Sequence, residues 1–186
     1  ALYPAMDSPK IREDLERASQ WADDFCSRFE GKLAVLLASA DGPAQLGAAL
    51  QEYNDLGELA DHPSVYSFLV HACAGDDAAV GKFYGATREV VTAIYSKTLF
   101  VALELNSLED GVLDKAWCYP KVTEYRPWIE AIRAERPWQL TTDLERLLHD
   151  KSLTGSQAWN RLFDQLMVSL RFDIGNERLT SEEAFA

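Results

Sequence analysis

One amphipathic period dominates the first forty or so residues and constrains the fold more than any other feature. Apolar side chains recur there at spacings of three and four residues, at Ile11, Leu15, Ala18, Ala22, Phe25, Phe29 and Leu33. This is the spacing of one face of an α-helix, and charged side chains occupy the opposite face. The pattern predicts one long helix over residues 9–39, with Ser8 as its N-cap, Pro9 in its first turn and Gly31 as its weak point.

Two more long segments with helical periodicity follow. The first begins at Asp41 and Pro43 and places Leu46, Leu50, Tyr53, Leu56 and Ala60 on one face. A proline disfavours the helical conformation in the residue before it, so His62-Pro63 predicts a break or kink, followed by a short helix over 64–74. The second period covers residues 77–106. Its β-branched residues would permit a strand, but its length and unbroken 3.6-residue period favour a helix.

Shorter elements complete the chain. We expect helices near 108–117 with Ser107 as cap, near 122–134, and from Thr142, where Glu145 would complete a capping box. A helix capped by Thr154 has a broad apolar face that contains Ala158, Trp159, Leu162, Phe163, Leu166, Met167 and Leu170. A β-hairpin follows at about 170–180 around Gly175-Asn176. A second capping box, Thr180 to Glu183, predicts a helix that starts at 181–186 and continues past Ala186.

These elements predict an all-α fold, an antiparallel helical bundle or stacked long helical hairpins with a small C-terminal β-hairpin. The chain has 186 residues, of which 47% are hydrophobic and 26% charged. That composition is typical of a folded globular domain, so residues 1–186 are expected to form a single helical domain.

Charge and cysteine content narrow the possible partners and location. A net charge of -12 repels phosphate backbones and anionic membrane surfaces, so we expect neither nucleic acid nor membrane as a partner. No apolar run approaches the roughly 20 residues that span a bilayer, and the first residues do not resemble a signal peptide. Cys26, Cys73 and Cys118 stand far apart and are interpreted as small apolar core residues of a cytoplasmic protein.

The three histidines are the first candidates for chemistry. Glu58 and His62 lie four residues apart beside Pro63, which is compatible with a metal site but is more simply an ion pair at a helix end. His71 and Cys73 are two residues apart, so on a helix they point to different faces, and a buried, hydrogen-bonded His71 is favoured over a nucleophile pair. His149 lies near a helix C-terminus, where the helix dipole favours an imidazole.

Other candidate features have ordinary structural explanations. Gly155 and Ser156 at a helix N-terminus form a weak anion site. The acidic pairs Asp23-Asp24 and Glu182-Glu183 are interpreted as solubilising charge. A group of aromatic residues is expected either to pack short helices over the long ones or to dock a partner. Its members are Trp117, Tyr119, Tyr125, Trp128 and Trp138.

Three segments of the chain resemble a known family. They are "LYP" at the start, "RPWQLTTDLERLLHDKSLTGSQAWNRLFDQL" in the last third and "LRFDIGNERLTSEEA" after it. In order and spacing they are similar to the N-terminal portion of oligoendopeptidase F, in the family that includes thimet oligopeptidase. The resemblance is most specific over "KSLTGSQAWNRLFDQL" and extends more loosely over the whole chain.

The resemblance implies that residues 1–186 are the N-terminal domain of a larger cytoplasmic zinc metallopeptidase that hydrolyses oligopeptides. In that family the zinc is held by a His-Glu-x-x-His helix and a later Glu, none of which this sequence contains. No catalytic, metal or substrate-binding residue is therefore assigned here, and zinc is expected in the parent enzyme and not in this chain. The expected partners are the oligopeptide substrate and the C-terminal catalytic domain of the same polypeptide, with this domain forming the wall and gate of the substrate cleft.

Two alternatives stay open at this point. One is a freestanding helical scaffold or adaptor that binds a protein partner through its aromatic surface. The other is a self-contained hydrolase that uses His71 or His149.

Overall fold

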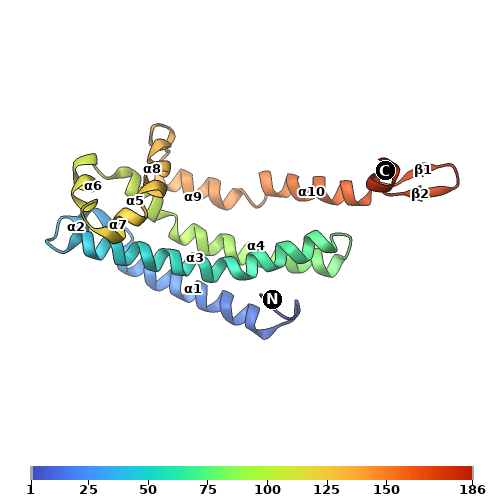
Figure 1. Cartoon of the computed structure of the whole chain (residues 1–186), viewed down its shortest axis with the longest axis horizontal. Coiled ribbons are helices and arrows are strands. Elements are labelled where there is room, and N and C mark those ends of the chain that lie inside the picture. The colour runs from blue at the N-terminus through green and yellow to red at the C-terminus, as the bar shows by residue number, and fades with distance from the viewer. Residues whose placement is uncertain (1, 186) are drawn as a thin grey trace.

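Three long helices lie side by side, and the second of them along the chain runs antiparallel to the other two (Figure 1). They are α1 (Pro9–Phe29), α3 (Gly42–Cys73) and α4 (Ala78–Thr98) in a computed structural model that describes residues 2–185. Their apolar stripes meet in the core, where Phe25, Leu50 and Ile94 are almost completely buried. The all-α class expected from the periodicity is confirmed.

The first helix is shorter than the sequence predicts. It ends at Phe29, Gly31 adopts a positive φ of 75°, and a separate helix α2 (Leu33–Leu37) follows. The carboxylate of Glu104 stabilises this break, because it accepts hydrogen bonds from the Gly31 and Leu33 backbone N–H groups at 2.6 and 3.0 Å. Ser8 holds the N-cap position, but its side chain makes no capping hydrogen bond.

The predicted break at Pro63 is wrong, because α3 continues through it to Cys73. Pro63 is buried within the helix. It has no N–H to donate to the carbonyl of Leu59, so one helical hydrogen bond is lost. Packing of α3 against both α1 and α4 holds the helix together across this point.

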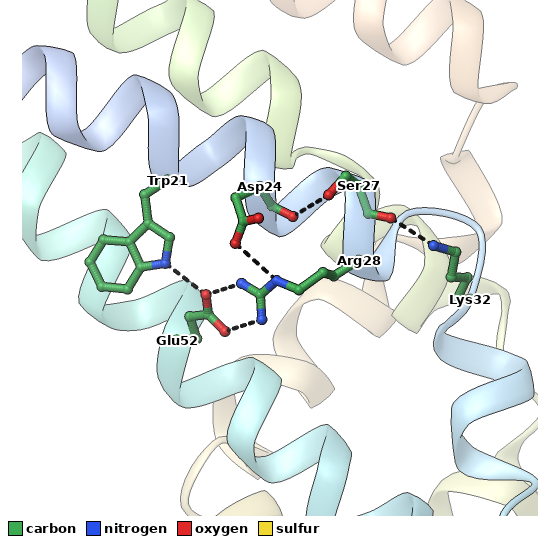
Figure 2. Close-up of polar contacts among 6 residues, drawn as sticks. All are labelled: Trp21, Asp24, Ser27, Arg28, Lys32 and Glu52. Atoms are coloured by element: carbon green, nitrogen blue, oxygen red, sulfur yellow. Dashed lines mark hydrogen bonds and ion pairs between the residues drawn. The ribbon is translucent and has the colours of Figure 1, made fainter.

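A polar cluster joins α1 to α3 at the edge of the core (Figure 2). Glu52 of α3 accepts a hydrogen bond from the Trp21 indole at 2.7 Å and a pair of hydrogen bonds from the Arg28 guanidinium. Arg28 also donates to Asp24 at 3.1 Å. Burial alone raises the pKa of Glu52, but the hydrogen bonds from Arg28 and Trp21 outweigh it and hold that pKa below its ordinary value.

Residues 77–106 are helical, as their length and period predict, but Leu99 divides them into α4 and α5 (Phe100–Ser107). Helices α6 (Asp110–Ala116), α7 (Pro120–Glu124) and α8 (Arg126–Ala134) then cover one end of the bundle, followed by a 3₁₀ turn at Arg136–Trp138. Ser107 does not cap α6 as predicted, because it belongs to the last turn of α5 and its hydroxyl donates to the Glu104 carbonyl.

The aromatic group of this region mostly packs inward. Trp117, Tyr119, Tyr125 and Trp128 are half-buried against the core, and among the group only Trp138, at 71% exposure, lies on the surface. Of the two interpretations left open, packing of the short helices therefore accounts for most of these side chains.

The remaining chain extends along and past the bundle (Figure 1). It comprises α9 (Thr142–Lys151), α10 (Ser156–Ser169), strands β1 (Phe172–Ile174) and β2 (Glu177–Leu179), and α11 (Ser181–Phe185). The strands pair antiparallel with Phe172 opposite Leu179, and the turn glycine Gly175 has a φ of 65°. The hairpin prediction is thereby confirmed.

The helix starts in this part of the chain differ from the predicted ones. Thr141 and Gly155, not Thr142 and Thr154, hold the N-cap positions of α9 and α10. The capping box at α11 is present, with the Glu183 N–H 3.3 Å from the Thr180 hydroxyl oxygen and the Thr180 N–H 2.8 Å from the Glu183 carboxylate. The expected helix over 181–186 is described as far as Phe185, and its last residue lies outside the described part of the chain.

Within residues 2–185, no helix combines the length and the apolar character that crossing a membrane requires.

Candidate functional site

Helix α9 is attached to the bundle by polar contacts. The Ser96 hydroxyl of α4 donates to Asp150 at 2.6 Å, and Arg146 pairs with Glu30 at 2.8 Å. These contacts join α9 to both α4 and the end of α1. The connection directs the following helix, α10, along the outside of the bundle (Figure 1).

The side of α10 that faces the bundle carries polar groups. Arg88 of α4 donates to the Gln157 side-chain oxygen, and Arg161 donates to the Leu153 carbonyl at 3.4 Å. A Cβ added at Gly85 of α4 would lie 3.6 Å from the Arg161 guanidinium, which places Arg161 against α4. Gln157 and Arg161 are four residues apart and share one side of the helix.

The opposite side of α10 is apolar and exposed. Its side chains are between 42% and 71% exposed, and we call this set the α10 face: Trp159, Leu162, Phe163, Leu166, Met167 and Leu170. An amphipathic surface helix normally turns its apolar stripe toward the core. In α10 the orientation is reversed within the described residues, so its apolar stripe is left without a partner.

The apolar surface extends beyond α10 in both directions. On α9, Leu144, Leu147 and Leu148 are between 46% and 56% exposed. Beyond the hairpin, the ring of Phe185 lies 5.9 Å from that of Phe172 and is itself 85% exposed. Several large apolar side chains exposed on one helix face mark an interaction site. The α10 face is therefore the candidate functional site.

A groove of about 640 Å³ runs between α1, α4 and α9, and it contains two ion pairs, Lys97–Asp23 and Arg146–Glu30. Lys97 contacts Asp23 at 2.6 Å, which shows that Asp23 is more than a solubilising charge. The Cys26 thiol donates to the Lys97 carbonyl at 3.1 Å. Burial, followed by the nearby Glu30 and Asp23 carboxylates, raises the pKa of Cys26, which disfavours a thiolate nucleophile. The groove holds α9 in place.

The histidines are dispersed. His62 is exposed, and Glu58 accepts a hydrogen bond from Asn54, so the predicted ion pair at this helix end does not form. His71 is half-buried and stacks on Tyr84 with ring centroids 4.6 Å apart, which corrects the prediction of a buried histidine. His149 lies in the last turn of α9 as predicted, and its buried Nδ1 atom has no hydrogen-bond partner among the described residues and lies 3.9 Å from the Asp150 carboxylate.

The interpretation of the cysteines as core residues is wrong for Cys73 and Cys118, which are exposed, while Cys26 is half-buried. In the described part of the chain, no three His, Cys, Asp or Glu side chains converge as metal ligands would. The residues present therefore do not fit a zinc site.

Sequence reasoning found the apolar stripe of α10 but missed that it points away from the bundle. The period shows which residues share a face and carries no information about what covers that face. One feature of the sequence could have indicated the outward orientation: the other side of this helix is polar and carries no second apolar stripe.

Comparison with known protein families matches part of the chain. Residues 104–172 match the N-terminal family model of the M3 peptidases, described as Oligopeptidase F. The matched residues run from α5 to the first residue of β1 and include all of α9, α10 and the α10 face. Neither the curated proteins nor the solved structures give a match.

Proposed function

We propose that this chain is the non-catalytic helical lobe of a zinc metallopeptidase that hydrolyses oligopeptides. The premise is that residues 104–172 carry the N-terminal region of an oligoendopeptidase F-like protein. The family match supports membership in an oligopeptidase-type protease. The observation that carries the role of this lobe is the outward-facing apolar side of α10.

The occupant we assign to the α10 face is the C-terminal catalytic domain of the same polypeptide. All residues of the α10 face lie inside the segment that matches the family model. The exposed apolar side chains are therefore located in the part of the chain that resembles the family. Burying several half-exposed Leu, Phe and Trp side chains would contribute roughly 25 cal/mol for each Å² removed from water. A domain seated there would bury the apolar stripe that the bundle leaves open.

The role that follows is steric and organisational. The three-helix bundle and its capping helices form a rigid wall, and such a wall beside a cleft admits flexible oligopeptides while it excludes folded proteins. Holding the peptide in one orientation lowers the entropic part of the barrier to hydrolysis. The zinc and its ligands would come from the catalytic domain, since no ligand set is present in the described residues. The net charge of -12 favours a peptide substrate over nucleic acid, and we expect the enzyme in the cytoplasm.

The first test is activity. The coding sequence beyond residue 186 should contain His-Glu-x-x-His, and the protein it encodes should cleave oligopeptides in a reaction that a zinc chelator abolishes. The 186-residue chain alone should show no peptidase activity. Absence of the motif downstream would contradict the proposal.

The second test concerns docking, with a matched pair of variants on α10. Leu166→Asp introduces a charge on the α10 face, where the native side chain is 54% exposed, and Gln165→Asp introduces the same charge at the next position, off that face. Both should leave the stability of the isolated chain nearly unchanged. In the full-length enzyme only Leu166→Asp should lower the thermal stability and the oligopeptidase activity. Equal effects of the two variants would refute this assignment.

The exposed α10 face also suits a second candidate function, that of an adaptor that binds a separate protein. An adaptor predicts a reading frame that ends soon after residue 186 and a stable chain indifferent to zinc. The downstream sequence therefore discriminates between the two.

A further inference from the structure

A recess of about 400 Å³ opens between α3, α4, α8 and Tyr125, which joins α7 to α8, away from every contact described above for α10. Its walls consist mainly of four aromatic side chains: Tyr53, Tyr95, Tyr125 and Trp128. Two carboxylates, Glu58 and Asp61, share the lining, and Gly57 contributes backbone without a side chain. Aromatic rings and carboxylates together at one recess are the surroundings that proteins use to hold organic cations.

The aromatic walls are held in fixed positions. Tyr53 and Trp128 lie with ring centroids 5.7 Å apart and an interplanar angle of 30°, and Tyr53 rests on the buried ring of Phe25 at 6.3 Å. The Tyr95 hydroxyl donates to Asp61 at 2.6 Å, and the Tyr125 hydroxyl donates to the Gln51 side-chain oxygen at 3.3 Å. The rings are therefore organised before any ligand arrives, which reduces the entropic cost of binding.

The recess is electronegative and has no cation of its own. Neither a Lys nor an Arg is among its lining residues in the described chain. Burial first, and then the neighbouring carboxylates, raise the pKa of Tyr53, Tyr95 and Tyr125.

The two carboxylates keep unused acceptor capacity. Asp61 accepts one hydrogen bond, from Tyr95, and Glu58 accepts one, from Asn54 at 3.1 Å. Among residues 2–185 neither makes an ion pair, although other carboxylates of the same bundle, such as Asp14 and Glu52, do. An ionised carboxylate has about four acceptor sites, so each can take further donors.

We propose that this recess binds the guanidinium group of an arginine side chain in a peptide. A guanidinium is planar, so it can stack on an aromatic ring while its N–H groups reach a carboxylate at the rim. A lysine ammonium offers a point charge without that flat surface. The identification of the ligand as a peptide rests on the proposed function, whereas recognition of the guanidinium rests on the recess itself.

The test is isothermal titration of the 186-residue chain with three capped tripeptides, in which alanines flank a central arginine, citrulline or lysine. Citrulline has nearly the same shape as arginine but a neutral urea in place of the guanidinium. The arginine peptide should bind saturably and about tenfold more tightly than the citrulline peptide, a difference of roughly 1.4 kcal/mol. The lysine peptide should fall between them, and free arginine should bind more weakly than the capped arginine peptide.

Three variants locate the binding. Asp61→Asn removes the rim charge at an exposed position and should bring the arginine affinity close to that of citrulline, whereas Asp173→Asn, an exposed aspartate of β1, should change nothing. Gly57→Leu fills the recess without altering its charge, and a Cβ at this position has room, 3.9 Å from the Tyr95 hydroxyl. It should weaken both peptides alike, and circular dichroism should confirm that each variant is folded.

The proposal is overturned by any of three results: no saturable binding of the arginine peptide, equal binding of arginine and citrulline peptides, or an Asp61→Asn variant that binds like the unaltered chain. Because the assay needs no hydrolysis, these outcomes do not bear on the peptidase proposal. Conversely, absence of a catalytic domain downstream would leave guanidinium binding by this chain intact.

Discussion

Glu52 is a residue at which one conservative substitution tests the polar contacts between two long helices. Its carboxylate accepts from the Trp21 indole at 2.7 Å and from the Arg28 guanidinium at 3.0 Å and through a second, shorter contact, so it joins α1 to α3 (Figure 2). Glu52→Gln preserves the shape but turns one acceptor oxygen into an NH₂ group. Because that NH₂ group would face an N–H donor of Arg28 or Trp21, one hydrogen bond would be lost.

The expected magnitude follows from burial. Hydrogen bonds to charged groups contribute roughly 1.5–3 kcal/mol, and the Glu52 side chain is 22% exposed while Arg28 is 42% exposed and keeps Asp24. Partial exposure and the remaining Asp24 contact favour the lower end, so we expect Glu52→Gln to lower the free energy of unfolding by about 1.5 kcal/mol. For a chain of this size, that corresponds to a fall in Tm of roughly 3–6 °C.

The assay is urea unfolding followed by circular dichroism at pH 7, with Glu58→Gln as the matched control. Glu58 lies on the same helix, is exposed, and has only Asn54 as a hydrogen-bond donor, so its substitution should cost less than about 0.5 kcal/mol. Equal losses in Glu52→Gln and Glu58→Gln would refute the reasoning.

The same substitution predicts a pH dependence. The pKa of Glu52 is held below its ordinary value of 4.5, so its contribution to stability is complete above that pH and is lost as the pH falls through the lowered value. The difference in unfolding free energy between the unaltered chain and Glu52→Gln should therefore shrink below about pH 4.5. A difference that stays constant down to pH 3 would contradict an ionised Glu52 in this cluster.

Four further substitutions test the packing and one buried hydrogen bond, each by urea unfolding. Gly81→Ala adds a Cβ to α4 with nothing within 4 Å of it, so it should stabilise the chain by about 0.5–1 kcal/mol. Gly42→Ala should destabilise the chain, because its Cβ would meet backbone atoms at 2.6 and 2.7 Å. Ile94→Ala, at a fully buried position, should cost roughly 2–5 kcal/mol. Tyr3→Phe removes the hydroxyl that donates to Asp14 at 3.0 Å and should cost about 1 kcal/mol.

The long helices could be predicted because their determinants are local. The period of Ile11 to Phe29 describes a stripe that α1 buries, and that of Val80 to Leu105 describes one that α4 and α5 bury; the buried residues follow both closely. The hairpin at Gly175 and the capping box at Thr180 are equally local, since their partners lie within a few residues.

The predictions were wrong where the local structure depends on residues that are distant in sequence. The break at Gly31 depends on Glu104, which supplies acceptors for two backbone N–H groups from another helix. Continuation of α3 through Pro63 depends on its packing against two neighbouring helices. Exposure of Cys73 and Cys118 depends on how the helices are placed, which composition does not specify.

The candidate site likewise has one feature that local sequence determines and another that distant contacts determine. The amphipathic pattern of α10 was visible in the sequence, but its outward orientation follows from tertiary contacts of Gln157 and Arg161 with the bundle and the preceding turn. The aromatic recess was not predicted, because its walls come from α3, α4 and the region of Tyr125 and Trp128, which are distant in sequence.

The most direct test of the central claim is hydroxyl-radical footprinting of the α10 face in this chain and in the full-length enzyme. Phe163 and Met167, which are 62% and 42% exposed, report on the face, and Val35 of α2, which is 74% exposed at the other end of the bundle, is the internal control. If the catalytic domain covers the face, Phe163 and Met167 should be labelled strongly in this chain and weakly in the full-length enzyme, with Val35 unchanged. Equal labelling of Phe163 and Met167 in both proteins would contradict docking at α10.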